Sequence, residues 1–430
     1  MDQKAKGDKQ VSGRKNIRLR YGKGYQDVYI PEANILTVLY PKDMAGVPDE
    51  EAEIRYALNN PIESASLDRL VKGKERIAIL ASDITRPAPS YKMLPPLLDV
   101  LNMAGVTDEQ ITIYFGLGYH RGHTEDEQRQ LVGSEVFERI KCVDHDINDC
   151  VYLGTTSRGT PVEVLKAVTE SDLIIATGNL EIHYRAGYSG GYKGLMPGVC
   201  SKKTVQTNHE WKFRPGSGPG INDGNPMRED IEEAGQMGGV NFILNVVLNS
   251  KREIVKAVAG HPLTAHRRGC TYIDKMYKCE IPQLADIVIA CTGGHPKDIN
   301  LYQAQKGFDH ASFAVRDGGI IILIGECPEG LGEKTFADWM LKAENVHQPV
   351  EWILQEFILG AHKAAVFCQV LERAQGYLVS AINPQLVRDI FFHPFDTGTA
   401  ALTQALAELG ADAKIIVMPQ ANSTLPILKK

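Results

Sequence analysis

Several features are missing from this sequence of 430 residues, and each absence excludes a class of protein. No apolar run approaches the roughly 20 residues that a membrane-spanning helix needs, so we expect no insertion into a membrane. An excess of positive charge is also missing, because the net charge is -6, and this argues against a nucleic-acid or anionic-membrane partner. The polar N-terminal segment has no apolar core and therefore does not resemble a secretory signal.

The eight cysteines contain no CxxC pair, so nothing indicates a structural zinc site. Scattered cysteines in a chain of this size are typical of reduced thiols, which predicts a cytoplasmic protein. Only Cys200 lies in the stretch of residues 181–209 that carries most of the candidate site residues. We interpret Cys200 as a small buried side chain rather than as a catalytic group. Solenoid repeats and low-complexity segments are absent as well.

What the sequence does contain is an alternation of β-type runs and helical segments, after three short β-rich runs between residues 17 and 40. Strands are predicted at residues 75–83, 111–120, 172–179, 240–249, 285–290, 318–326 and 413–419. Helices are predicted at residues 49–59, 93–103, 162–168, 360–374 and 401–410, with others starting after Thr124 and near Leu301. This alternation predicts an α/β fold with mostly parallel sheets.

A domain boundary is predicted near residues 275–281, because a new α/β unit begins there. We therefore expect an N-terminal α/β domain at residues 1–278 and a C-terminal α/β domain at residues 279–430. The first domain would carry the candidate lysine and histidines, and the second would contribute substrate-binding residues. We expect the active site in a cleft between the two domains.

Polar residues follow the ends of three predicted strands in the first domain. Asp83 and Arg86 follow one strand, His120 follows the next, and His183 and Lys193 follow a third. In open α/β sheets, ligands bind beyond the carboxyl ends of the strands. These side chains should therefore converge on one crevice.

Each of these residues also has a structural interpretation. Asp83 and Arg86 fit the recognition of a carboxylate or phosphate, but equally a local ion pair. His120 fits a catalytic base or an exposed loop histidine. Lys193 follows two glycines, and a lysine in such a loop is more often a phosphate ligand than a covalent anchor. His209 completes no common zinc motif with these residues.

In the second domain, Tyr302 and Lys306 are four residues apart and would share one face of a helix. A phenol and a cation on one face suit an acidic substrate, whereas the alternative is an ordinary exposed face. The motifs to be considered together are DITRP (83–87), GLGYHR (116–121), EIHYRAGYSGGYKGLMPG with the later NH (181–209), NFILNVVLN (241–249) and NLYQAQK (300–306). In this combination and order they resemble the nickel-pincer lactate racemase family.

The resemblance implies a cofactor, a nickel-pincer nucleotide whose pyridinium ring carries thioamide and thiocarboxylate groups. This mononucleotide would be bound covalently to Lys193, and His209 would supply the remaining ligand of the nickel. His120 and His183 would be the two catalytic acid–base groups. The resemblance further assigns cofactor contacts to Asp83 and Arg86, and substrate contacts to Arg86, Tyr302, Gln303 and Lys306.

The implied activity is that of an isomerase, a racemase or epimerase that inverts C2 of a 2-hydroxy acid by reversible hydride transfer to the cofactor. The substrate would be lactate-like or larger, such as malate or an aromatic or sugar acid, and other proteins would synthesise the cofactor. One alternative is an NAD-type 2-hydroxy acid dehydrogenase, although no GxGxxG turn opens a helix after the first strand. The other is a non-catalytic protein that binds nickel or a nucleotide.

Overall fold

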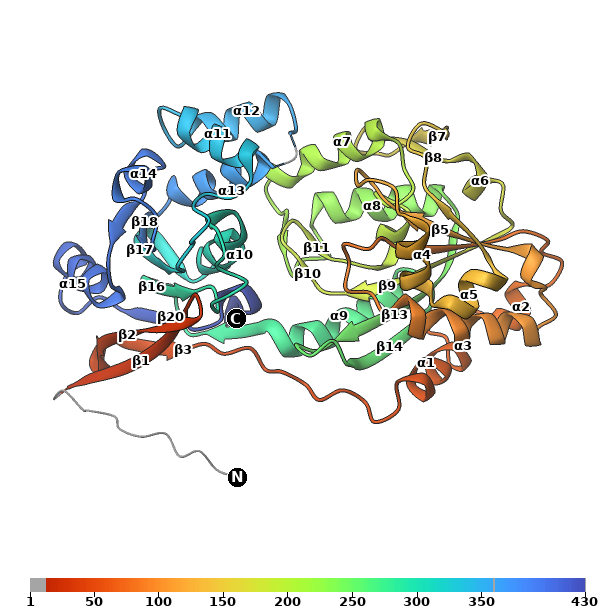
Figure 1. Ribbon diagram of the computed structural model, residues 1–430, viewed down its shortest axis with the longest axis horizontal. Helices are drawn as coiled ribbons and strands as arrows, with labels where there is room; N and C mark the ends of the chain where they lie inside the picture. Colours follow the sequence, from red (N-terminus) through yellow and green to blue (C-terminus); the bar gives the residue numbers. More distant parts are fainter. Residues whose placement is uncertain (1–12, 359, 430) are drawn as a thin grey trace. The chain divides into compact units, whose positions relative to one another are not determined.

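The computed structural model describes residues 13–358 and 360–429 (Figure 1). Residues 42–276 form one compact unit, which we call the N-terminal unit. The described residues before residue 42 and from residue 277 onward form the other, which we call the C-terminal unit. No helix within the described ranges is both long and apolar enough to cross a membrane.

The N-terminal unit is built on a six-stranded sheet with the order β14-β13-β9-β4-β5-β6. The strands are β4 (Ile77–Ser82), β5 (Ile111–Gly116), β6 (Lys141–Asp144), β9 (Leu173–Leu180), β13 (Val240–Leu248) and β14 (Ile254–Gly260). All neighbours are parallel except β13 and β14. Ile79 and Leu80 of β4 pack into two different hydrophobic clusters, so both faces of the sheet are covered, as a parallel sheet requires.

Nine helices lie within this unit or at its end in the described residues. They are α1 (Glu50–Asn59), α2 (Leu67–Leu70), α3 (Ser90–Met103), α4 (Glu125–Val132), α5 (Ser134–Arg139), α6 (Lys166–Thr169), α7 (Lys202–Glu210), α8 (Pro226–Met237) and α9 (Thr264–Tyr277). The helix expected after Thr124 is α4, and Thr124 caps it: the Thr124 side chain accepts a hydrogen bond from the Glu127 amide, and the Glu127 side chain accepts one from the Thr124 amide.

The predicted helix at residues 162–168 is wrong over most of its length. Residues Pro161–Leu165 form strand β8, which pairs antiparallel with β7 (Cys150–Thr155), and only α6 is helical. Val162 and Val164 are buried on either side of the half-buried Glu163. This period of two is the pattern of a strand, and it outweighs the helical tendency of the residues that follow.

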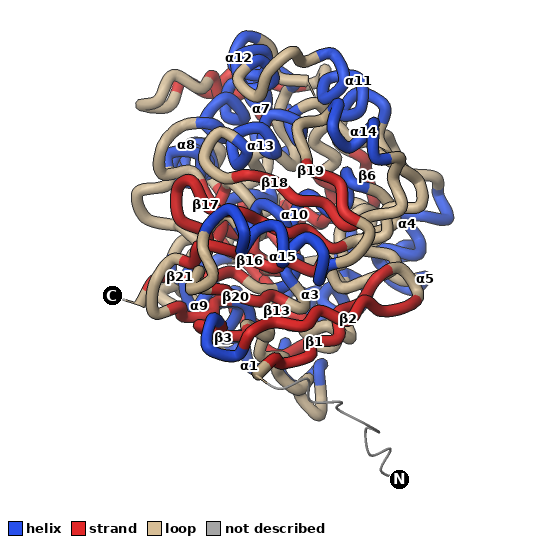
Figure 2. The backbone as a smooth tube through the Cα atoms, turned by 90° about the vertical axis from the view of Figure 1, so that its left-hand side faces the viewer, coloured by secondary structure: helices blue, strands red, loops and turns tan. Residues whose placement is uncertain are grey.

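The C-terminal unit contains a second six-stranded sheet, which is parallel throughout and has the order β19-β18-β17-β16-β20-β3. Its strands are β3 (Ile35–Val38), β16 (Ala285–Cys291), β17 (Val315–Ile324), β18 (Gln375–Val379), β19 (His393–Phe395) and β20 (Ile415–Met418). The helices are α10 (Leu301–Ala311), α11 (Lys334–Lys342), α12 (Gln348–Gln355), α13 (His362–Leu371), α14 (Pro384–Asp389) and α15 (Gly398–Leu409). Figure 2 shows these strands in red among the blue helices.

The N-terminal segment differs from the expected division at residue 278. Strand β3 pairs with β20, and the hairpin of β1 (Arg14–Tyr21) and β2 (Gly24–Pro31) packs its apolar residues against the C-terminal sheet. The segment therefore belongs to the C-terminal unit, because an edge strand follows the sheet that completes its hydrogen bonds. The expectation of a cleft between the domains stays a prediction.

Each sheet has one point where its winding direction reverses. In the N-terminal unit the chain runs from β4 outward to β6 and then returns to β9 on the other side of β4. In the C-terminal unit it runs from β16 outward to β19 and returns to β20 on the other side of β16. Ligands of such sheets bind at the carboxyl ends of the strands that flank the reversal. The place to search in the N-terminal unit is therefore beyond Ser82 and Leu180.

Candidate active site

Asp83 and His120 form a hydrogen-bonded pair at this place. Asp83 directly follows β4 and is 2% exposed, while His120 lies in the loop after β5. Burial opposes the ionisation of Asp83, but hydrogen bonds from His120 and Thr85 outweigh it and hold the pKa of Asp83 below its usual value. An ionised carboxylate only accepts hydrogen bonds, so Nδ1 of His120 donates and the lone pair lies on Nε2.

The neighbouring His123 has a structural position instead. Its Nδ1 donates to Oδ1 of Asp144 at 2.7 Å, and its Nε2 accepts the amide hydrogen of Ile84 at 3.1 Å. Both ring nitrogens are therefore occupied, and the side chain is only 1% exposed. This histidine fixes the loop after β4, which supports His120 as the stronger candidate of the two.

His183 lies in the short strand β10 (Ile182–His183), just beyond β9. Its Nδ1 accepts the backbone amide hydrogens of Arg185 at 3.3 Å and Ala186 at 3.0 Å. Burial is the main cause that lowers the pKa of His183 well below its usual value, and the guanidinium groups of Arg86 and Arg228 act in the same direction. The imidazole is therefore neutral near pH 7.

Lys193 is carried by a tightly fixed glycine turn. Gly190 and Gly191 have φ values of 72° and 61°, which favour glycine, and a Cβ on Gly191 would lie 2.8 Å from Cδ2 of His266. The amide of Gly191 donates to Oδ1 of Asn245 at 2.8 Å. Lys193 follows in the 3-10 turn at Gly191–Gly194. The turn therefore fixes the backbone position of Lys193, and a residue with a side chain does not fit at Gly190 or Gly191.

The amine of Lys193 is in an environment that favours its neutral form. Burial, followed by the positive charges of Arg228 and Arg86, lowers the pKa of Lys193 well below its usual value. A neutral amine is a nucleophile at neutral pH, whereas an ordinary lysine is protonated. Arg86 also lies with its Nε 3.9 Å from Oδ1 of Asp83. The structure therefore brings Asp83, Arg86, His120, His183 and Lys193 into one region, as the strand ends predicted.

Three further residues hold this region, and the sequence analysis missed them. Asn245 and His266 contact the glycine turn, and the fully buried Arg228 donates from Nε to the carbonyl oxygen of Ala186 at 3.0 Å. Asn245 could have been found, because it is a polar residue inside the otherwise apolar run of β13. Nothing in the local pattern of the other two distinguishes them from ordinary helix residues.

His209 lies in the last turn of α7, and its Nδ1 donates to the carbonyl oxygen of Val205. Its lone pair therefore lies on Nε2, which is the arrangement of a metal-binding histidine with a fixed ring. Among residues 13–358 and 360–429, no group of three or more His, Cys, Asp or Glu side chains could hold a metal ion. A metal at His209 would therefore need ligands other than a cluster of these four side-chain types.

Cys200 is fully buried, and its thiol donates to the carbonyl oxygen of Leu195 at 3.3 Å. Burial raises the pKa of this thiol well above its usual value, so the reactive thiolate is not formed near neutral pH. The geometry agrees with the interpretation of Cys200 as a packing residue.

The remaining predicted site residues belong to the C-terminal unit, on helix α10. Asn300 caps this helix, and Tyr302 and Lys306 follow one turn apart. Nζ of Lys363 donates to the carbonyl oxygen of Tyr302 at 2.8 Å and lies 3.7 Å from the centre of its ring. Gln303 is exposed on the same helix. The predicted site residues are thus divided between the two units.

Comparison with known proteins identifies the family to which this chain belongs. Residues 21–220 match the lactate racemase N-terminal domain and residues 281–425 match the lactate racemase C-terminal domain. The lactate racemase of Thermoanaerobacterium thermosaccharolyticum is 33% identical over 95% of this chain and 99% of its own length. The lactate racemase of Lactiplantibacillus plantarum is 32% identical over 86% of this chain and 89% of its own length. The chain belongs to the lactate racemase family of isomerases.

Solved structures agree with this membership. The lactate racemase apoprotein from Thermoanaerobacterium thermosaccharolyticum superposes with a TM-score of 0.85 over 97% of this chain and 100% of that chain, at 33% identity. A protein from Thermotoga maritima superposes with a TM-score of 0.60 over 90% of this chain and 100% of that chain, at 19% identity, which indicates a shared fold only. The family is the one that the motifs resemble, and its two domains account for the two mostly parallel sheets.

Proposed function

We propose that this chain is a 2-hydroxy acid racemase or epimerase that uses a nickel-pincer nucleotide bound covalently to Lys193. Membership of the lactate racemase family supports the reaction class. The observation that carries the attachment is the state of Lys193, a lysine whose pKa is lowered by burial and by Arg228 and Arg86. A neutral amine is able to form an amide-type bond. A lysine that only binds phosphate would instead bind it more strongly as a charged ammonium group.

The side chains of the N-terminal unit fit this cofactor in two further respects. The excess of positive charge around Lys193 and His183 suits an anionic nucleotide. His209 presents one imidazole lone pair, which is sufficient if the cofactor itself supplies the other nickel ligands. Asp83 and Arg86 are proposed to contact the cofactor. When bound, the cofactor would supply reversible hydride transfer at C2 of the substrate.

Removal of the hydride requires that the hydroxyl proton leaves as well. The hydrogen on C2 of a 2-hydroxy acid is only weakly acidic, so direct deprotonation at this carbon is difficult. Loss of a hydride from C2 and a proton from the hydroxyl group instead gives a planar 2-keto acid. Nε2 of His120 carries the lone pair that such a base needs, and Asp83 would stabilise the imidazolium that forms. His183 is the second histidine proposed for this chemistry.

The substrate carboxylate requires cationic and hydrogen-bonding groups. We propose this function for Arg86, Tyr302, Gln303 and Lys306. A guanidinium binds a carboxylate through two parallel hydrogen bonds, and an ammonium adds a point charge. The substrate is a lactate-like or larger 2-hydroxy acid, and the proteins that synthesise the cofactor are the expected partners.

The attachment is tested by intact mass measurement of the protein produced together with cofactor-synthesising enzymes, followed by peptide mapping around Lys193. We expect a nickel-containing adduct on Lys193 that is absent from a Lys193→Ala variant. A matched control is Lys202→Ala, at the exposed start of α7, which should keep the adduct. An unmodified Lys193 in protein from the complete system would contradict the covalent cofactor.

A further inference from the structure

The winding reversal of the C-terminal sheet lies between β16 and β20, and a side-chain contact joins the loops that follow these two strands. Lys297, in the loop after β16, donates from Nζ to Oγ of Ser423 at 3.3 Å. Ser423 ends the 3-10 turn at Ala421–Ser423, which follows β20. Ligands of open α/β sheets bind where such loops meet. The amine of Lys297 is therefore at the position where a ligand of the C-terminal unit is expected.

Helix α10 brings Lys306 to the same 3-10 turn. Gly307 directly follows Lys306, and a Cβ on Gly307 would lie 2.6 Å from Oδ1 of Asn422 and 3.3 Å from Cβ of Ala421. The turn therefore packs closely against the helix beside Lys306. Burial, followed by the positive charge of Lys306, lowers the pKa of Lys297. The two amines are thus close enough to repel each other.

A third lysine approaches α10 from α13. Nζ of Lys363 donates to the carbonyl oxygen of Tyr302 at 2.8 Å. In a helix this oxygen faces the amide four residues later, which is the amide of Lys306. Burial, followed by the positive charge of Lys306, lowers the pKa of Lys363 to about 8. Lys306 is therefore the common neighbour of Lys297 and Lys363, and we call these three residues the lysine cluster.

In the part of the chain that the structure describes, no carboxylate forms an ion pair with an amine of the lysine cluster. Burial, followed by the negative charge of Glu333, raises the pKa of the neighbouring Tyr302. The Glu333 carboxylate, however, accepts the backbone amides of Thr335 at 3.0 Å and Phe336 at 2.7 Å. A group of like charges without a counter-ion costs stability and attracts a ligand of opposite charge. The cluster therefore has the properties of an anion-binding site.

The C1 carboxylate of a 2-hydroxy acid needs only part of this charge. Arg86 and Lys306 are already proposed to bind that carboxylate, together with hydrogen-bonding groups. A lysine ammonium binds an anion as a point charge, so Lys297 and Lys363 remain for a second anionic group. We propose that the substrate is a 2-hydroxy acid that carries a second anionic group, and that Lys297 and Lys363 bind this group beside Lys306. The proposal rests on the proposed function and narrows its substrate class.

Three compounds test the second anionic group in the cofactor-loaded enzyme. Malate carries it as a carboxylate and 3-phosphoglycerate carries it as a phosphate, whereas the monoamide of malate keeps the C1 carboxylate and is neutral at the other end. We expect kcat/KM for malate or for 3-phosphoglycerate to exceed that for the monoamide at least about tenfold. The better of the two identifies the second group. A monoamide that reacts as well as both of them would overturn the proposal.

Substitutions of the cluster test which lysines bind this group. Lys297→Met and Lys363→Met should each lower kcat/KM for the better dianionic substrate by about 3- to 30-fold, and for the monoamide much less. Lys306→Met should lower both, because Lys306 is also proposed to bind the C1 carboxylate. The matched control is Lys334→Met, at the exposed start of α11, which should leave the ratio of the two values unchanged. Equal losses for both substrates in Lys297→Met and Lys363→Met would mean that these lysines are structural, and would contradict the proposal.

Binding to the full-length apoprotein tests the lysine cluster without the reaction. Succinate has two carboxylates and no hydroxyl group, and succinamate has an amide in place of one carboxylate. In NMR titrations of the lysine side chains, succinate should raise the pKa of Lys363 above about 8, because a bound anion stabilises the charged amine, and succinamate should raise it less. An unchanged pKa with succinate would overturn the proposal. If succinate raises the pKa but the loaded enzyme inverts no 2-hydroxy acid, the proposed function fails and the anion site remains.

Discussion

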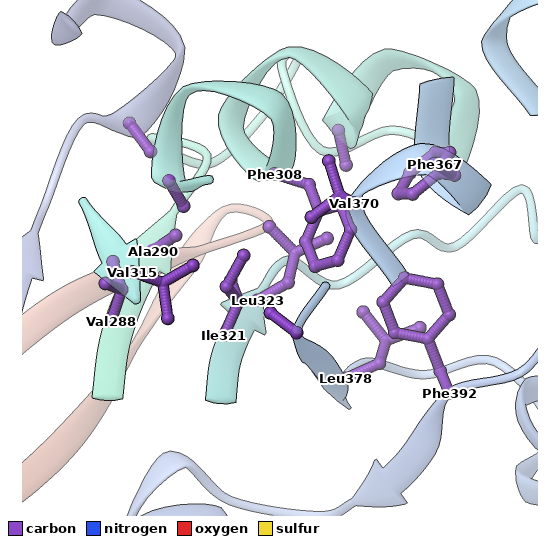
Figure 3. Packing of buried hydrophobic residues seen from close by; sticks show 14 of the residues in the cluster. Val288, Ala290, Phe308, Val315, Ile321, Leu323, Phe367, Val370, Leu378 and Phe392 are labelled. Carbon is purple, nitrogen blue, oxygen red and sulfur yellow. The ribbon is translucent and has the colours of Figure 1, made fainter. Parts of the chain in front are cut away.

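The two six-stranded sheets share a winding pattern but differ in what lies around their strands. In the N-terminal unit, the reversal between β4 and β9 has Lys193 beside it, together with histidine, aspartate and asparagine side chains that form hydrogen bonds. In the C-terminal unit, α10 packs an aromatic cluster with Phe308, Phe367 and Phe392 against the sheet (Figure 3). On the same helix, Tyr302 and Lys306 are half-buried, and Tyr302 packs against this apolar cluster.

This difference shows that a shared topology fixes where a site lies but not what chemistry it performs. The winding reversal only brings strand ends together. The protonation state of each group is then set by contacts such as the Asp83 carboxylate or the amides beside His183. We therefore expect substitutions in the N-terminal unit to change catalysis, and substitutions in the aromatic cluster to change stability.

The largest effect is expected from Asp83→Asn in the loaded enzyme. The amide can donate to the ring of His120, which would favour the wrong tautomer and move the lone pair away from Nε2. We predict a fall in kcat of about 10²–10⁴-fold, measured by chiral chromatography of the product. The matched control is Asp144→Asn at the His123 pair, which should destabilise the loop but lower kcat much less. Equal losses in the two variants would mean that both pairs are structural.

Phe367→Ala should have the largest effect in the C-terminal unit. Phe367 is fully buried, with its ring centroid 5.2 Å from that of Phe308 and 5.7 Å from that of Phe392. Removing the ring should lower the free energy of unfolding by about 3–5 kcal/mol, measured by denaturant titration. Leu341→Ala, at a position that is 46% exposed, should change it by less than about 0.5 kcal/mol. A small effect of Phe367→Ala would show that this core does not stabilise the unit.

Lys363→Met tests whether the contact of Lys363 with Tyr302 on α10 supports substrate binding. The substitution removes the hydrogen bond to the carbonyl oxygen of Tyr302 and the cation above its ring. If Tyr302 binds substrate, KM should rise about 2- to 30-fold, equivalent to about 0.5–2 kcal/mol, while kcat changes little. Steady-state kinetics measure both constants. A fall in kcat with unchanged KM would instead place Lys363 in the chemical step.

The same lysine also predicts a pH dependence of stability. Burial, followed by the positive charge of Lys306, lowers the pKa of Lys363 to about 8 in the folded protein, from 10.5. Between these values the unfolded chain binds more protons, so stability should rise with pH from about 8 to 10.5. Thermal unfolding at several pH values should show a smaller rise in Lys363→Met than in wild type. An identical pH dependence in both proteins would contradict the lowered pKa.

Much of this arrangement could be predicted from the sequence. The apolar runs predict the buried strands, and the polar residues directly after β4, β5 and β9 predict the region that contains Asp83, His120 and His183. The strand at Pro161–Leu165 was missed, because five residues carry too few periods to separate a strand from a helix. The pairing of β3 with β20 joins segments almost 400 residues apart, and no local pattern indicates such a contact.

The tautomers of the histidines could not be predicted from the sequence. They depend on which group faces Nδ1, and this is a carboxylate for His120, a carbonyl oxygen for His209 and two amides for His183. The burial of Lys193 depends in the same way on α8 and β13, which are distant in sequence. Residue types identify the candidates, and the folded backbone decides their protonation.

The most direct test of the proposed function is the equilibration of one pure enantiomer by the cofactor-loaded protein without added NAD. Lactate, malate, an aromatic 2-hydroxy acid and a sugar acid should each be supplied as a single stereoisomer, and the product analysed by chiral chromatography. The account predicts that at least one of them is inverted at C2 until both configurations are present at equilibrium, and that Lys193→Ala abolishes this. Retention of configuration in all four by protein that carries the adduct would contradict it.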